Sequence, residues 1–172
     1  MSLPLVYLKP GEMHVCRQTC RIETVLGSCV SVVLHCPVTH VSAMNHAVMP
    51  IGSNSLHYVD YSLEQMIKQF RALGGRRQGM QAKLFGGANM FDQGQRSSIQ
   101  VGQKNVEVAL GWLAEQKIGL ITSNTGGTEG RKLVFLSETG QVFVKKLDRV
   151  NPAERFLPGA HAPVRKVCPQ RI

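Results

Sequence analysis

Apolar residues recur at helical spacing in two stretches of the chain, and each stretch predicts a helix. Ser62 and Gln65 have the spacing of a capping box, and Gly74-Gly75 supplies a stop. The face between these signals is apolar and consists of Leu63, Met66, Ile67, Phe70 and Leu73. A second helix is predicted from Gln103 to Lys117, with Gly119 just beyond its end. Its apolar stripe consists of Val106, Ala109, Leu110 and Leu113.

Other segments have the length and the β-branched or alternating pattern of strands. They run from Ser28 to Leu34, Val41 to Val48, Gln81 to Phe85, Ile118 to Thr122, Lys132 to Leu136 and Gln141 to Lys146. The last two flank Glu138-Thr139-Gly140, which is a hairpin signal. The early strands follow one another too closely for crossover helices. The pattern therefore predicts an α/β (α+β) class: a layered sandwich of mixed, largely antiparallel β-sheet with packed helices.

Composition supports a single globular domain. The chain has 172 residues, of which 43% are hydrophobic and 18% charged, unlike disordered chains. The N-terminal stretch lacks a basic region ahead of an apolar one, and no apolar run approaches the length of a bilayer span. Five cysteines form an odd set without a CxxC pair, which favours reduced thiols. We therefore expect a cytoplasmic protein without membrane insertion.

The charge is strongly basic and is concentrated at the C-terminus. The formal net charge is +9, which favours an acidic partner without identifying it. The stretch from Lys145 to Ile172 carries seven basic residues against Asp148 and Glu154, and it contains four prolines. Prolines at that spacing exclude a long helix or a central strand. We therefore divide the chain into a domain at 1–147 and a basic, Pro-containing tail at 148–172.

Cys29 is the candidate nucleophile. It follows Gly27-Ser28 where a turn enters a predicted β-branched strand. Glycine permits a sharp turn there, and freed backbone N–H groups could face an oxyanion. A free thiol is only slightly ionised at neutral pH, so a catalytic cysteine needs a base. His46 lies on the next predicted strand and is the candidate base.

Other interpretations of these residues remain open. A cysteine in an apolar strand is more often buried core, and a histidine among apolar neighbours is more often a hydrogen-bonded core residue. His14, Cys16 and Cys20 resemble half of a zinc site, and His35, Cys36 and His40 are the candidates to complete it. Their spacing matches no common finger or ribbon, so we expect no metal.

Two glycine-rich segments invite comparison with phosphate-binding loops. They are Phe85-Gly86-Gly87-Ala88-Asn89 and the stretch from Thr125 to Lys132. Neither matches a P-loop or a dinucleotide-binding fingerprint. Tight turns at strand ends explain both, although Arg131 and Lys132 beside the second could line a substrate cleft.

Together these residues resemble the chemoreceptor glutamine deamidase family, CheD. The resemblance spans most of the chain. It rests on Thr24-Val25-Leu26-Gly27-Ser28-Cys29, His46 with Pro50, Lys83-Leu84-Phe85-Gly86-Gly87-Ala88, Gly102-Gln103-Lys104-Asn105-Val106, and Gly126-Gly127 followed by Gly130-Arg131-Lys132. Several matches in order are more specific than an isolated Gly-Ser-Cys.

The resemblance implies a catalytic constellation of Thr24, His46 and Cys29, with Glu23 as an alternative to Thr24 for orienting the imidazole. It implies no cofactor and a fold similar to the catalytic domains of deamidating toxins such as cytotoxic necrotizing factor. The implied activity is that of a protein-glutamine glutaminase, an amidohydrolase that converts glutamines of methyl-accepting chemotaxis receptors to glutamate and so tunes signal transduction. Some members also bind and stimulate CheC, a phosphatase of the response regulator.

The expected mechanism is that of a cysteine hydrolase. Cys29 would attack the glutamine carboxamide, N–H groups near Gly27 and Ser28 would hold the oxyanion, and His46 would shuttle protons through a thioester pathway. The substrate would be the cytoplasmic helical hairpin of the receptor. Cys29 should then be alkylated by iodoacetamide ahead of the other cysteines, with a pH midpoint well below that of a free thiol.

Two rival functions differ in class from this enzyme. A non-catalytic chemotaxis adaptor would bind receptors or a CheC-type phosphatase and would leave Cys29 buried and unreactive. Nucleic-acid binding is suggested by the basic tail, but aromatic residues make up only 6% of the chain, so we expect no specific nucleic-acid partner.

Overall fold

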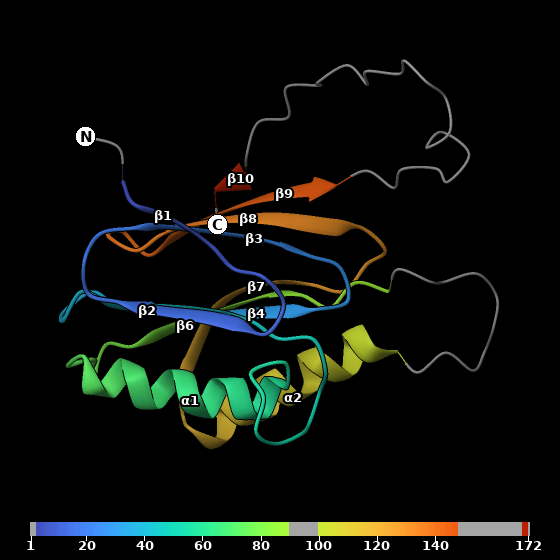
Figure 1. The fold of residues 1–172 in the computed structure, drawn as a ribbon, viewed down its shortest axis with the longest axis horizontal. Coiled ribbons are helices and arrows are strands. Elements are labelled where there is room, and N and C mark those ends of the chain that lie inside the picture. Colours follow the sequence, from blue (N-terminus) through green and yellow to red (C-terminus); the bar gives the residue numbers. More distant parts are fainter. Residues whose placement is uncertain (1–2, 90–99, 148–169, 172) are drawn as a thin grey trace, which may run out of the picture.

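The computed structural model describes residues 3–89, 100–147 and 170–171, which form two β-sheets and two helices (Figure 1). The first sheet has the order β1-β3-β8-β9-β10 and the second has the order β2-β5-β4-β6-β7. The strands are β1 Leu5–Tyr7, β2 Glu12–Cys16, β3 Arg21–Leu26, β4 Val30–Cys36, β5 Val41–His46, β6 Gln81–Gly86, β7 Gly119–Thr125, β8 Gly130–Leu136, β9 Gln141–Leu147 and β10 Gln170–Arg171. The helices are α1 Val59–Ala72 and α2 Val101–Glu115.

The elements stack in three layers, as Figure 1 shows: the β1-containing sheet, the β2-containing sheet, and the two helices. Most strand pairs are antiparallel, whereas β1 with β3 and β6 with β7 are parallel. This arrangement confirms the predicted layered α/β sandwich. Two strands of different sheets, β3 and β5, face each other across the inner layer, and both carry candidate site residues.

Side-chain alternation along the strands divides the core in two. The middle sheet sends one set of residues toward the helices and the other toward the first sheet. The helix-facing core includes Val32, Leu34, Leu63, Phe70 and Leu84. The core between the sheets includes Ile22, Leu26, Val33, Phe85 and Phe135. Both faces of the middle sheet are therefore buried, which makes its central strand β4 continuously apolar apart from Ser31 and His35.

Both predicted helices are present, but α1 begins earlier than the predicted capping box at Ser62. The helix begins at Val59 with Tyr58 as its N-cap, and no side chain caps it. Ser62 lies inside the helix, where its hydroxyl accepts a hydrogen bond from the Asn45 amide at 3.0 Å, so the predicted capping box is wrong. The predicted stop is confirmed, because Gly74 has φ +88° and its N–H and that of Gly75 bond back to the last turn.

Helix α2 ends close to its predicted limit but buries a different stripe. Its buried residues are Gly102, Asn105, Ala109, Trp112 and Leu113, whereas Leu110, which we had placed on the apolar face, is 41% exposed. Among the described residues, no helix is long and apolar enough to cross a membrane.

All six predicted strands are present, and the structure adds β1, β2, β3 and the short β10. The hairpin at Glu138-Thr139-Gly140 is confirmed as the β8–β9 turn, with Gly140 at φ +72°. One boundary differs in a way that concerns chemistry: Cys29 lies before β4, in the turn that follows β3, and not on a strand. Residues 148–169 of the predicted tail lie outside the described residues, so the domain boundary stays a prediction.

Candidate active site

A histidine and a threonine from opposite sheets meet in the inner layer. His46 ends β5 and is 3% exposed, and Thr24 lies in β3 and is fully buried. The Thr24 Oγ1 lies 2.8 Å from His46 Nδ1 and donates its proton to the Leu8 carbonyl, also at 2.8 Å. A hydroxyl has one proton, so Thr24 must accept a hydrogen bond from Nδ1–H. The arrangement selects the His46 tautomer with Nε2 unprotonated.

The free ring nitrogen is buried but unpaired. His46 Nε2 has no hydrogen-bond partner among the described residues. A buried unpaired acceptor is costly, so each one calls for an explanation, and a catalytic role is one of those known. The Ser31 Oγ is likewise buried without a described partner. Ser31 and His46 both lie between the Val33–Met44 pair and the Val30–Ala47 bridge, so they are neighbours across β4 and β5. Two unsatisfied polar atoms therefore share one small region of the inner layer.

Cys29 lies beside this region. Val30 and Ala47 exchange both backbone hydrogen bonds, each 2.9 Å long, just beyond the regular β4–β5 ladder. Cys29 and His46 each precede one member of that pair, so they occupy diagonal positions on the same side of the sheet. Diagonal residues have Cα atoms about 7–8 Å apart, which long side chains can span. Cys29 is partly buried against the inter-sheet core, on the side where Thr24 holds His46.

Burial sets the charge state of both groups. It raises the pKa of the Cys29 thiol, although the residue's own backbone N–H acts in the opposite direction. Burial also lowers the pKa of His46, and the Leu8 carbonyl and Glu12 only partly offset this. Both shifts favour the neutral form at pH 7, for the Cys29 thiol and for the His46 imidazole. We had expected the alkylation of Cys29 to have a pH midpoint well below that of a free thiol. The environment of Cys29 favours a midpoint above it instead.

The turn that carries Cys29 is fixed by its carbonyl groups. The Gly27 carbonyl accepts a bond from Ala88 N–H at 2.9 Å, and the Cys29 carbonyl accepts one from Gly87 N–H at 2.8 Å. The Ser28 carbonyl accepts a third bond, from the side chain of Asn105 in α2 at 3.0 Å. Each peptide unit of the turn therefore has a defined orientation.

Asn105 belongs to the Gly102–Val106 motif, and the structure shows what its side chain does. Its Nδ2 donates to Ser28 and also to the Val48 carbonyl at 2.8 Å. One fully buried amide on α2 thus joins the turn before β4 to the segment after β5. The sequence held one sign of this role: an asparagine on the helix face that packs against the sheet. A buried polar side chain in a helix usually has specific hydrogen-bond partners.

Glu23, the alternative to Thr24, points away from the imidazole. Successive residues of β3 face opposite sides, and Glu23 forms ion pairs with Arg21 and, at 2.9 Å, with Lys132. Lys132 holds the pKa of the Glu23 carboxyl below its usual range. The geometry therefore assigns the contact with His46 to Thr24.

Arg131, which we had placed beside a substrate cleft, is buried and structural. It is 4% exposed and donates to Asn124 Oδ1 at 2.7 Å, to the Gly86 carbonyl at 3.1 Å and to the Gly126 carbonyl at 2.5 Å. These bonds fasten the two glycine-rich turns together. Positive φ angles at Gly86, Gly87, Gly126 and Gly127 confirm both as tight turns.

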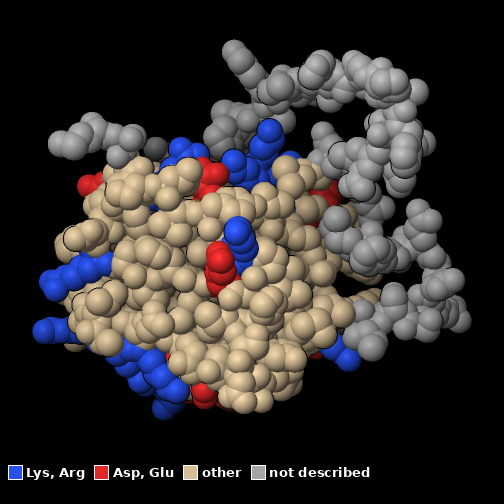
Figure 2. Space-filling view, viewed as in Figure 1, with Lys and Arg blue, Asp and Glu red and all other residues tan. Residues whose placement is uncertain are grey.

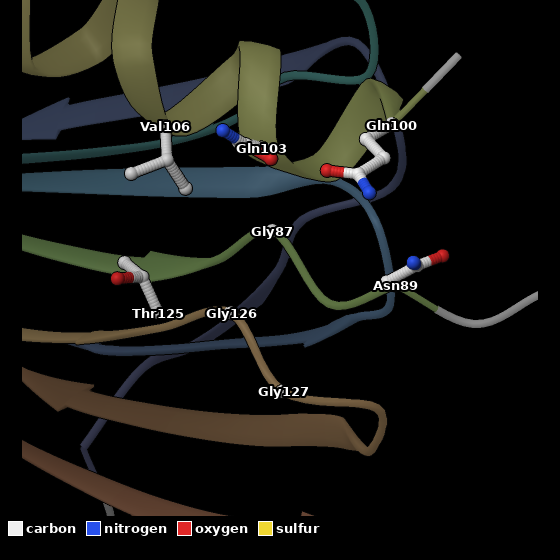
Figure 3. Close-up of a pocket in the computed structure, with 8 residues that line it drawn as sticks. All are labelled: Gly87, Asn89, Gln100, Gln103, Val106, Thr125, Gly126 and Gly127. Carbon is white, nitrogen blue, oxygen red and sulfur yellow. The ribbon is translucent and has the colours of Figure 1, made fainter. Parts of the chain in front are cut away.

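A pocket of about 360 Å³ opens at the two glycine-rich turns, beside the beginning of α2 (Figure 3). In Figure 3 its walls come from α2 on one side and from the loops after β6 and β7 on the other. Its lining residues are Gly87, Asn89, Gln100, Gln103, Val106, Thr125, Gly126 and Gly127, none of which is charged. Gly87 N–H also bonds the Cys29 carbonyl, so the pocket wall is continuous with the turn that carries Cys29.

The structure brings together the three residues of the predicted zinc half-site, but not the three residues that were candidates to complete it. His14, Cys16 and Cys20 come together, with ligand atoms within 4.8 Å of one another. His35 instead bonds Ser42 at 2.9 Å, and the Cys36 thiol lies 3.7 Å from the Gln78 carbonyl. His40 occupies a turn with φ 55°. These last three residues do not join the cluster.

Comparison with known proteins identifies the chain's relatives. Residues 45–146 match the family model described as CheD chemotactic sensory transduction. The chain is 40% identical over 150 residues to a probable chemoreceptor glutamine deamidase CheD 2 from Geobacter sulfurreducens, covering 86% of this chain and 93% of that protein. It is 35% identical over 147 residues to a probable chemoreceptor glutamine deamidase CheD from Sulfurimonas denitrificans, covering 83% and 94% respectively. With matches over most of both lengths, this chain belongs to the CheD family.

Proposed function

We propose that the chain deamidates glutamine side chains of chemotaxis receptors, with Cys29 as nucleophile and His46 as general base. The observation that carries this proposal is the hydrogen bond from His46 Nδ1 to Thr24, which leaves Nε2 free in the layer against which Cys29 packs. A base must be able to accept the proton of the group that it activates. The names of the Geobacter and Sulfurimonas relatives support the choice of receptor glutamine as substrate.

In the first half of the reaction, His46 Nε2 takes the thiol proton and the Cys29 sulfur attacks the carboxamide carbon. The resulting oxyanion collapses, the carbon–nitrogen bond breaks, and Nε2–H protonates the departing nitrogen, so that ammonia leaves and a thioester remains. In the second half, neutral Nε2 takes a proton from water and the hydroxide attacks the thioester. The sulfur departs, regains its proton from Nε2–H, and the product is a glutamate carboxyl group.

The backbone of the turn is suited to hold the oxyanion. In a trans peptide the carbonyl and the following N–H point in opposite directions. Because the carbonyls of Gly27 and Ser28 point to Ala88 and Asn105, the N–H groups of Ser28 and Cys29 point away from them. We assign these two N–H groups as oxyanion donors, with Gly27 providing the turn.

The pocket beside the turn suits an uncharged side chain. Its glutamine, asparagine and threonine groups offer donors and acceptors, and its lack of charge suits a neutral carboxamide better than a carboxylate. The glutamate product would therefore be bound less well than the substrate. A CheC-type phosphatase as a second partner stays a prediction.

The test is peptide mass spectrometry of a receptor cytoplasmic fragment after incubation with the full-length protein. Wild type should convert specific glutamines to glutamate, and Cys29→Ala should convert none. Cys36→Ser is the matched control, because it removes another cysteine away from the turn and should retain activity. Binding of the fragment without conversion by any of the three proteins would favour the non-catalytic adaptor instead.

A further inference from the structure

Outside the active site, three soft donor groups converge at one end of the inner layer. His14 and Cys16 lie on the same side of β2, and Cys20 lies just before β3. Their ligand atoms all lie within 4.8 Å of one another, and the two sulfurs are 3.1 Å apart. Cys16 is 8% and Cys20 is 5% exposed, whereas His14 is partly buried at the sheet edge.

The backbone holds this cluster in place. Cys16 pairs with Ser42 at the end of β2, so its position is fixed by the sheet. Cys20 N–H donates to Ser137 Oγ at 2.8 Å, and its carbonyl accepts from Ser137 N–H at 3.1 Å. The same Ser137 hydroxyl donates to the Gln18 carbonyl at 3.3 Å, inside the loop between the cysteines. The loop is therefore preformed.

The donor set, with three protein ligands, is that of an open zinc site. Zinc binds thiolates at about 2.3 Å and imidazole nitrogen at about 2.0–2.1 Å in tetrahedral geometry. Two thiolates on one zinc ion are then about 3.8 Å apart, which the cluster reaches if the sulfurs separate slightly. Cys16 and Cys20 are separated by three residues, a separation found between zinc ligands. Two thiolates neutralise the ion, so the buried site carries no net charge.

A disulfide is the competing interpretation. It needs the sulfurs at about 2.05 Å, together with an oxidant, and does not account for the histidine. The His14 imidazole beside the two thiols favours a metal site over a disulfide, because it supplies a third ligand of the type that zinc accepts.

We propose that His14, Cys16 and Cys20 bind a single Zn²⁺ ion, with water at the fourth position. The site joins β2 of the middle sheet to the beginning of β3 in the first sheet. Thr24 lies four residues beyond Cys20, about 13 Å along the strand, so the ion is separate from the catalytic groups.

The test uses the full-length protein, reduced, stripped of metal and incubated with Zn²⁺ or with Co²⁺ as a spectroscopic probe. After desalting, wild type should retain a single zinc ion per chain by elemental mass spectrometry. Co²⁺ should give a sulfur-to-cobalt charge-transfer band and the intense visible bands of four-coordinate geometry. Zinc should also raise the melting temperature of the wild type.

Three variants make the result specific. Cys16→Ser with Cys20→Ser should lose both metal and charge-transfer band, and His14→Gln should weaken binding by about tenfold or more, as expected for a lost ligand. Cys36→Ser, at a buried cysteine outside the cluster, should bind as wild type does. If the double variant does not fold, His14→Gln still tests the proposal, because His14 is only partly buried and its replacement should not prevent folding. Equal zinc retention by wild type and His14→Gln, or a persistent Cys16–Cys20 disulfide in reducing buffer, would overturn the proposal.

Discussion

The Thr24 hydroxyl forms two hydrogen bonds: it donates one to the Leu8 carbonyl and accepts one from His46 Nδ1–H. Thr24→Val keeps the shape but removes both hydrogen bonds, so the imidazole is free to rotate or to change tautomer. We expect kcat to fall on the order of 10²-fold, the lower range for loss of general-base function. Thr24→Ser retains the hydroxyl and should stay near wild type in the same deamidation assay. Equal activity in the valine and serine variants would contradict this role.

The ionisation of Cys29 gives a second residue-scale prediction. Burial raises the thiol pKa, so the reactive thiolate accumulates only as the pH rises above the ordinary thiol range. Iodoacetamide alkylation of Cys29, followed by peptide mass spectrometry, should therefore show a pH midpoint above that of an unperturbed thiol. Among the described cysteines Cys29 should still react first, because Cys16, Cys20 and Cys36 are buried. A midpoint well below the usual value would instead indicate a resting thiolate–imidazolium pair.

At the scale of elements, α2 holds the turn that carries Cys29 through Asn105. Asn105→Ala leaves the carbonyls of Ser28 and Val48 without their side-chain donor, which should lower the free energy of unfolding by about 1–3 kcal/mol. The deamidation rate should fall as well, because Ser28 belongs to the turn that carries Cys29. Denaturant titration and the receptor assay measure the two effects. Lys104→Ala, at the preceding exposed position, should change stability by no more than about 0.5 kcal/mol.

Two glycines of α2 should respond in opposite directions to the same substitution. A Cβ at Gly102 would stand 2.7 Å from the backbone of Gly87 and Ala88, so Gly102→Ala should destabilise the fold by about 1–3 kcal/mol. A Cβ at Gly111 meets nothing within 4 Å, so Gly111→Ala should stabilise the fold by about 0.5–1 kcal/mol. Thermal denaturation of both variants checks the pair. A Gly102→Ala variant as stable as wild type would mean that α2 does not approach this backbone closely.

Local patterns predicted elements better than they predicted their ends. The spacing of apolar residues revealed both helices, because amphipathic faces have a clear period. The false capping box at Ser62 arose because the same spacing occurs inside a helix, where that hydroxyl serves Asn45 instead. Strand β1 has three residues and β2 carries His14 and Glu12, so neither has the apolar alternation that identifies a strand.

At the scale of the whole molecule, the site depends on contacts between sheets that no local pattern encodes. The nearness of the Cys29 turn to β5, which carries His46, could be predicted from neighbouring segments, since β4 and β5 are joined by a short turn. The catalytic roles of the two residues stay a prediction. To choose between Thr24 and Glu23, one must know which residues of β3 point toward the second sheet. The hydrogen bond from Thr24 to the Leu8 carbonyl could not be predicted from the sequence. The spacing of His14, Cys16 and Cys20 already resembled half of a zinc site, but the structure was needed to show that their ligand atoms meet and that His35, Cys36 and His40 do not join them.

Net charge gives a prediction for the whole chain. The chain carries +9, and in Figure 2 the lysine and arginine side chains lie mainly toward the margins of the face shown, around a largely uncharged surface. Long-range attraction to an acidic receptor surface is screened beyond about 10 Å at 0.1 M ionic strength. Salt should therefore lower kcat/KM for a receptor fragment through slower encounter, with little effect on kcat.

The control for this prediction separates encounter from chemistry. Iodoacetamide is uncharged, so its rate of reaction with Cys29 should not follow ionic strength, because screening acts on the approach of a charged partner and leaves the buried His46–Thr24 hydrogen bond intact. Measuring both rates from low salt to about 0.15 M therefore isolates the charge effect. If kcat/KM stayed constant across that range, the excess of lysine and arginine would have no part in binding the receptor. If both rates fell together, salt would be altering the site itself.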